Sequence, residues 1–125
     1  MLQVFRELEA ACRGQQMTLH HGDCVEGDAL SHALAKSLGW RIEVHPPIYS
    51  NKRAWCKDAD VYHLPRDYMD RNDDIAAACY ALVATPDEPH EVRRSGTWST
   101  VRRASKRNRY IIVIQPDGTI VRAYR

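Results

Sequence analysis

The sequence predicts an α/β fold, in which a mainly parallel sheet carries helices on both faces. Segments with a helical spacing of apolar residues alternate along the chain with short runs typical of strands. The length of 125 residues, with 44% hydrophobic and 27% charged residues, fits one globular domain spanning residues 1–125. Ligands of such folds bind at the carboxyl ends of the strands, so the loops there are the first candidates for a site.

Each element follows from a local signal. Gly14 and Gly39 stop the first two helices, and Asp28 is the expected N-cap of the second. A Pro-Asp-Gly turn at residues 116–118 predicts a C-terminal β-hairpin. The apolar residues of segment 48–65 follow neither a helical nor a strand spacing, which predicts a long functional loop. The predicted helices are residues 4–12, 29–38, 66–78 and 95–106, and the predicted strands are residues 17–21, 40–44, 80–84, 110–114 and 119–123.

Composition narrows the function classes. No apolar run approaches the roughly 18 residues of a membrane span, and no signal segment opens the chain, so we expect a cytoplasmic protein without a membrane partner. The net charge of +2 does not mark a dedicated nucleic-acid binder. The four cysteines include no close pair of the kind found in zinc sites, and His20 and His21 should point to opposite faces of a strand. We therefore expect neither a metal nor a cofactor.

Two glycine-containing turns between a strand and a helix are candidate anion-binding sites. Glycine lets the backbone approach an anion closely, and a helix N-terminus offers free N–H groups and the positive end of a dipole. An ordinary turn explains either motif alone, whereas two at one predicted sheet edge favour a ligand site. The first turn contributes Gly22, Asp23, Cys24 and Asp28, and the second contributes Arg94, Ser95, Gly96, Thr97 and Trp98.

Further candidates lie outside these turns. Pro46 ends the second predicted strand, and Arg71 and Asn72 lie in the third helix, where Arg71 could reach a phosphate or simply be a surface charge. Tyr49 or Trp55 in the long loop could stack on a base.

Taken together, these segments resemble the SLOG superfamily, which includes DNA-processing protein A, the LONELY GUY phosphoribohydrolases and small YspA-like proteins of bacteria and phages. The likeness rests on His20-His21-Gly22-Asp23-Cys24 with Asp28, His45-Pro46-Pro47, Arg71-Asn72 and Arg94 to Thr100, and runs from about Leu19 to Gly118. It implies a Rossmann-like three-layer sandwich that binds nucleotides or nucleotide-derived ligands.

The chain departs from that pattern in three ways. Glu26 stands where related proteins usually have glycine, and a carboxylate there would repel a phosphate. Thr100 occupies the position of the catalytic Glu of the LONELY GUY motif, and threonine cannot act as a carboxylate base. The usual first strand has no counterpart before the first helix, which starts almost at Met1. A misplaced start codon, a sheet paired without this strand or a partner chain in its place would each explain the difference, and an uncovered sheet edge predicts a homo-oligomer.

The leading expectation is a module that senses or sequesters a nucleotide or nucleotide-derived phosphorylated ligand. One alternative is a nucleotide N-glycosidase or phosphoribohydrolase-type enzyme, with Asp23 or Asp28 as its candidate acid/base. Another is a nucleic-acid-binding module that uses the basic stretch from Arg93 to Arg109.

Overall fold

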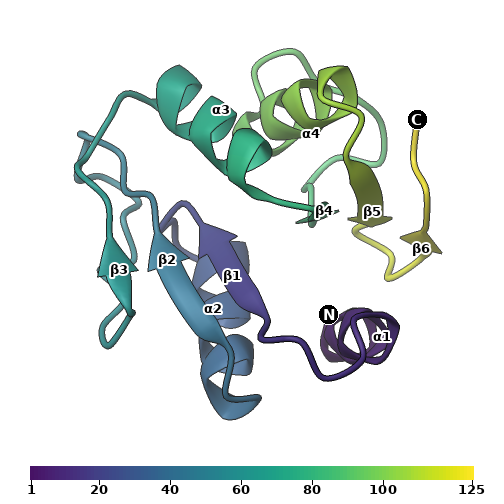
Figure 1. Ribbon diagram of the computed structural model, residues 1–125. Coiled ribbons are helices and arrows are strands. Elements are labelled where there is room, and N and C mark those ends of the chain that lie inside the picture. The colour runs from purple at the N-terminus through teal and green to yellow at the C-terminus, as the bar shows by residue number, and fades with distance from the viewer. The chain divides into compact units, whose positions relative to one another are not determined.

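The protein has mixed α/β structure, with four helices and two three-stranded sheets, in a computed structural model that describes residues 1–125 (Figure 1). The chain divides into two compact units, Met1–Pro65 and Arg66–Arg125, and each is described by itself. None of the helices combines the length and the apolar character needed to span a membrane.

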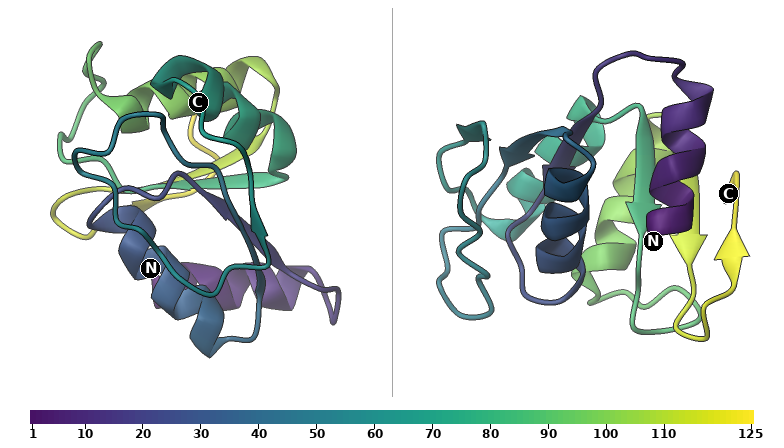
Figure 2. Two further views of the ribbon diagram at one scale, coloured as in Figure 1. Left: turned by 90° about the vertical axis from the view of Figure 1, so that its left-hand side faces the viewer. Right: turned by 90° about the horizontal axis from the view of Figure 1, so that it is seen from below.

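The first unit is built around a parallel sheet with the strand order β1-β2-β3. Helix α2 packs against β1 and β2, with which it makes its contacts (Figure 2). Ile42 and Val44 of β2 are fully buried, as expected for alternate residues that point toward a covering helix. The elements are α1 (Leu2–Ala11), β1 (Thr18–His21), α2 (Gly27–Ser37), β2 (Arg41–Val44) and β3 (Val61–Tyr62).

Helix α1 contacts this unit through Trp40, the residue before β2. The ring of Trp40 stacks on Phe5 with 4.7 Å between centroids, and its indole N–H donates a 2.8 Å hydrogen bond to Glu9. A stacked aromatic pair with its polar atom satisfied holds an amphipathic helix firmly in place.

The second unit pairs β4 with β5 in parallel and β5 with β6 as an antiparallel hairpin. Helices α3 and α4 lie side by side, and α4 also contacts β4 and β5 (Figures 1 and 2). Trp98 of α4 is 1% exposed and is the largest fully buried side chain of the core. The elements are α3 (Tyr68–Ala78), β4 (Ala81–Ala84), α4 (Gly96–Lys106), β5 (Tyr110–Ile114) and β6 (Ile120–Val121).

The structure confirms the α/β class and the order of the predicted elements, and it corrects several details. Helix α2 begins at Gly27 with Glu26 as its N-cap residue, so Asp28 lies in the first turn instead of capping it. The loop of residues 48–65 contains β3, and the last strand has two residues instead of five. The strands form two ladders where one sheet was expected, and β1 and β4 each pair along one edge only.

Glu26 has the backbone conformation of a glycine, with φ 71° and ψ −108°. A side chain with a Cβ is strained there, at a cost on the order of 1–3 kcal/mol. We expect Glu26→Gly to raise the free energy of unfolding by about 1 kcal/mol, measured by urea denaturation, because glycine removes the strain but adds chain entropy to the unfolded state.

The matched control is Glu7→Gly in the exposed middle of α1, which should lower the free energy of unfolding by about 1 kcal/mol. A Glu26→Gly protein that is less stable than the parent would refute the strain assignment.

Candidate functional site

Asp23 ties the turn after β1 to the loop that follows β2. Its side chain is fully buried, its Oδ2 accepts a 2.7 Å hydrogen bond from Arg53 Nε, and its Oδ1 accepts one of 2.8 Å from the Cys56 amide. Burial by itself would raise the pKa of Asp23, but the hydrogen bonds from Arg53 and Cys56 outweigh it and lower that pKa. The carboxylate is therefore charged and enclosed at neutral pH, which does not suit a residue that must exchange protons with a substrate.

Three successive amides of the same turn already have partners inside the unit. The Asp23 amide donates to His21 Nδ1 at 3.0 Å, the Cys24 amide to Asp28 Oδ2 at 3.0 Å, and the Val25 amide to the Lys52 carbonyl at 2.9 Å. Asp28 also lies in the first turn of α2, so its carboxylate stabilises both the preceding turn and the helix N-terminus. The ligand-binding role of Gly22, Asp23, Cys24, Asp28 and the buried Pro46 stays a prediction.

His21 belongs to a chain of hydrogen bonds that runs across the covered face of the sheet. His21 Nε2 lies 2.9 Å from His32 Nδ1, and His32 Nε2 lies 2.8 Å from the Lys57 carbonyl. Because His21 Nδ1 accepts the Asp23 amide hydrogen, the proton of a neutral His21 must be on Nε2, and that of His32 on its own Nε2. Every ring nitrogen in this chain is then satisfied.

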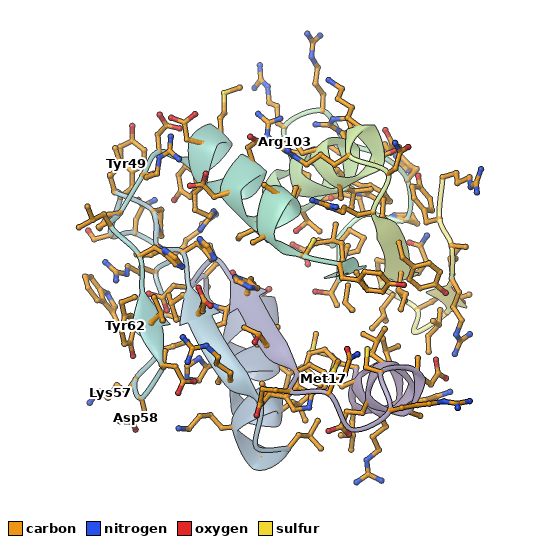
Figure 3. All side chains as sticks on the ribbon, viewed as in Figure 1. Met17, Tyr49, Lys57, Asp58, Tyr62 and Arg103 are labelled. Atoms are coloured by element: carbon orange, nitrogen blue, oxygen red, sulfur yellow. The ribbon has the colours of Figure 1, made fainter.

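The loop that receives this chain is held to β3. Tyr62 Oη donates to the Cys56 carbonyl at 2.8 Å and accepts from the Ala59 amide at 3.1 Å. Figure 3 shows Tyr62 with Lys57 and Asp58, the residues between these two anchors. Burial and the neighbouring Asp23 raise the pKa of the Cys56 thiol to about 12, so it is a neutral thiol.

The opposite face of the same sheet gathers three histidines and a glutamate. His20 lies opposite Glu43 in the register of β1 and β2. Residues two apart along a strand share a face, so His45 lies on the same face as Glu43, and the register of β2 and β3 brings His63 beside His45. His20 Nδ1 lies 2.9 Å from His45 Nε2, His63 Nε2 lies 2.8 Å from Glu43 Oε1, and the rings of His45 and His63 stack at 4.1 Å.

The charge state of this cluster follows from its neighbours. Burial lowers the pKa of His20, with the charges of His63 and Arg41 acting in the same direction and Glu43 opposing them. For Glu43, burial would raise the pKa, but the hydrogen bond from His63 and the nearby cationic groups outweigh it and lower that pKa. At neutral pH the group thus combines an uncharged His20 imidazole with an ionised Glu43 carboxylate.

The N-terminus of α4 in the second unit has the features of an anion site. Ser95 caps the helix by accepting a 3.2 Å hydrogen bond from the Trp98 amide. No hydrogen bond uses the amides of Gly96 and Thr97, the first turn carries no acidic residue, and nothing lies within 4 Å of the place where Gly96 would carry a Cβ. The exposed Arg94 precedes the cap in the chain, as predicted for this turn.

Arg71 and Asn72, which were predicted as site residues from α3, are brought to this turn. Arg71 Nε donates a 2.9 Å hydrogen bond to Asn72 Oδ1, and Asn72 Nδ2 reaches the Gly96 carbonyl at 3.5 Å. Both side chains are buried, which is uncommon for an arginine and fixes the position of the Asn72 amide. Thr100 Oγ1 donates to the same carbonyl at 3.0 Å.

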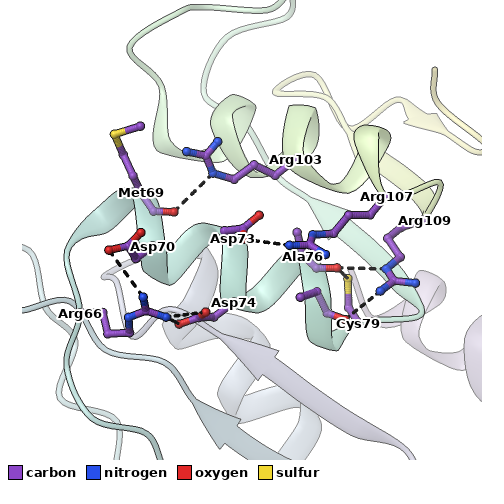
Figure 4. A network of polar contacts seen from close by, with 11 residues as sticks. Arg66, Met69, Asp70, Asp73, Asp74, Ala76, Cys79, Arg103, Arg107 and Arg109 are labelled. Carbon is purple, nitrogen blue, oxygen red and sulfur yellow. Dashed lines mark hydrogen bonds and ion pairs between the residues drawn. The ribbon is translucent and has the colours of Figure 1, made fainter.

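Three of the seven cationic residues in the basic stretch from Arg93 to Arg109 make contacts with α3 (Figure 4). Arg103 donates to the Met69 carbonyl, Arg107 pairs with Asp73 at 2.9 Å, and Arg109 donates to two carbonyls at the end of α3. Cations near a helix C-terminus satisfy its orphan carbonyls and complement its dipole. The pair with Asp73 balances one charge of the stretch, and the carbonyl contacts fix the positions of Arg103 and Arg109.

Sequence reasoning missed the cluster of His20, Glu43, His45 and His63. The histidines are visible in the sequence, but their convergence depends on the register of three parallel strands and on β3, which was not predicted. Trp55, a predicted stacking residue, is 57% exposed with the Arg53 guanidinium 3.8 Å above its ring.

Asp23→Asn should lower the free energy of unfolding by about 3 kcal/mol at pH 7, because it leaves the Arg53 charge without its buried partner. The lowered pKa stabilises the folded state above the ordinary value of 3.8, and this contribution is lost as pH falls through the folded-state pKa. Urea denaturation should therefore show the difference between parent and variant shrinking below about pH 4.

Asp87→Asn makes the same chemical change on an exposed residue and should alter stability by less than about 0.5 kcal/mol at any pH. An Asp23→Asn protein as stable as the parent at pH 7 would contradict the assigned role of the ion pair.

Comparison of the chain with protein-family models, curated proteins and solved structures finds no match.

Proposed function

We propose that the protein binds the phosphate group of a nucleotide or nucleotide-derived ligand at the N-terminus of α4. The observation that carries this proposal is the pair of unused amides at Gly96 and Thr97 on an open glycine. Backbone N–H groups at the start of a helix, with the positive end of its dipole behind them, form a ready anion site.

The surroundings of this turn favour an anion over a cation or a neutral ligand. Arg94 is exposed beside the cap, and the first turn of α4 contains no carboxylate that would repel a phosphate. By contrast, α2 starts with Glu26 and Asp28, whose carboxylates already supply the negative charge that its N-terminus attracts. The second unit is therefore where the phosphate is held.

The fold, the oligomeric state and the state of Asp23 also bear on this proposal. A Rossmann-like sandwich of the SLOG type supports a nucleotide or nucleotide-derived compound as the source of that phosphate, because such folds bind nucleotides at the carboxyl ends of their strands. The single-sided pairing of β1 and β4 supports association into a homo-oligomer through a strand edge. The enclosed state of Asp23 supports binding over hydrolysis by that carboxyl.

Calorimetric titration of the full chain with AMP, ADP and ADP-ribose tests this proposal, with adenosine as the ligand without phosphate. We expect binding of at least one phosphorylated compound and none of adenosine. Gly96→Ala should weaken that binding by roughly tenfold or more, because the added methyl group stands where the phosphate approaches.

Stability measurements separate this effect from unfolding. Gly96→Ala meets no neighbouring atom and should unfold within about 0.5 kcal/mol of the parent. Arg94→Gln should also weaken binding, whereas Lys106→Gln, the same charge change near the far end of α4, should not. A folded parent protein that binds none of the phosphorylated compounds would end the proposal.

A further inference from the structure

We propose that His20, Glu43 and His45 form a binding site for a divalent transition-metal ion such as Zn²⁺, with His63 orienting the glutamate. This site lies wholly within the first unit and is independent of the proposed phosphate site. Zinc is bound in proteins by imidazole nitrogens and carboxylate oxygens, and two histidines with one glutamate leave a fourth position for water or a substrate.

The distances suit such an ion. One ligand atom from each of the three residues lies within 4.8 Å of the others. Ligand atoms around a tetrahedral zinc, at bond lengths near 2.0–2.1 Å, are about 3.3 Å apart. His20 Nδ1 and His45 Nε2, now 2.9 Å apart, would need to separate by only a few tenths of an ångström.

A tautomer of His20 can accommodate the proton that lies between the two rings. At 2.9 Å, one of the facing nitrogens carries a hydrogen, which a metal ion must replace. The structure gives His20 Nε2 no hydrogen-bond partner. His20 can therefore hold its proton on Nε2 and present the Nδ1 electron pair to the ion, while His45 presents Nε2.

The buried group of His21, His32 and Cys56 also has ligand atoms within 4.8 Å of one another. Its hydrogen-bond pattern, however, disfavours a metal ion. A metal on His21 Nε2 would force the proton of that ring to Nδ1, where the Asp23 amide already donates its own hydrogen. Two donors would then face each other in a buried place. At His20, by contrast, the proton can lie on Nε2, which has no hydrogen-bond partner in the structure.

His63 completes the arrangement from the next strand. Its Nε2 lies 2.8 Å from Glu43 Oε1, and its ring stacks on His45. Groups that hydrogen-bond a metal ligand fix its orientation, and their loss usually costs roughly 10- to 100-fold in affinity. The side chains of Glu43 and His63 are 21% and 42% exposed, so an ion can reach the site from solvent.

Titration of the full chain with Zn²⁺ and with the spectroscopic probe Co²⁺ tests the assignment. We expect one Co²⁺ per chain with visible d–d bands and no thiolate-to-cobalt charge-transfer band, since Cys56 is not a ligand. His20→Ala, His45→Ala and Glu43→Gln should each weaken Zn²⁺ binding by more than about 100-fold, and His63→Ala by roughly 10- to 100-fold.

His90→Ala, which removes an exposed histidine from the second unit, is the matched control and should bind Zn²⁺ like the parent. If a variant does not fold, nuclear magnetic resonance of the parent still decides, because Zn²⁺ should shift the ring signals of His20 and His45 and not those of His21 and His32. Absence of Zn²⁺ binding overturns the proposal, and so does a thiolate band or binding that is lost only with Cys56→Ser.

Discussion

The register of the three parallel strands in the first unit determines most of its chemistry. Alternation along β1 sends His20 and His21 to opposite faces of the sheet, although they are neighbours in the chain. His21 joins a closed chain of hydrogen bonds to His32 on the covering helix, whereas His20 meets His45 beside Glu43. A shift of the register by one residue would exchange these two environments and place Glu43 among the apolar side chains under α2.

The two helix N-termini show how similar local sequences lead to different chemistry. Each follows a strand and begins at a glycine, but the turn before α2 uses its amides to bind its own carboxylate, its neighbouring ring and a backbone carbonyl. The turn before α4 uses one amide for the Ser95 cap and leaves two without a partner. A helix dipole already neutralised by a nearby carboxylate gains little from an anionic ligand, which is why we propose the phosphate site at α4 and not at α2.

Several arginines also pair with groups of the fold. In the basic stretch, Arg103, Arg107 and Arg109 hold α3 against α4, and Arg109 covers carbonyls at the end of α3 that have no partner within that helix. Arg53 is paired with a buried carboxylate, and Arg71 with the Asn72 amide. These five arginines therefore have partners within the fold.

The sequence by itself determined the α/β class, the order of the elements and the start of α4 at Ser95 and Gly96, because apolar periodicity, capping residues and glycine stops act over a few neighbouring residues. It also predicted that His20 and His21 diverge. Only the tertiary structure decided that Asp28 is not a cap, that Asp23 is enclosed by Arg53, and that Arg71 and Asn72 meet Gly96. The last two outcomes depend on contacts between residues 30 and 24 positions apart in the chain, which no local pattern encodes. The histidine cluster is the clearest case, since His20 meets His45 only when β1 is paired with β2, and His63 joins them only when β3 is paired with β2.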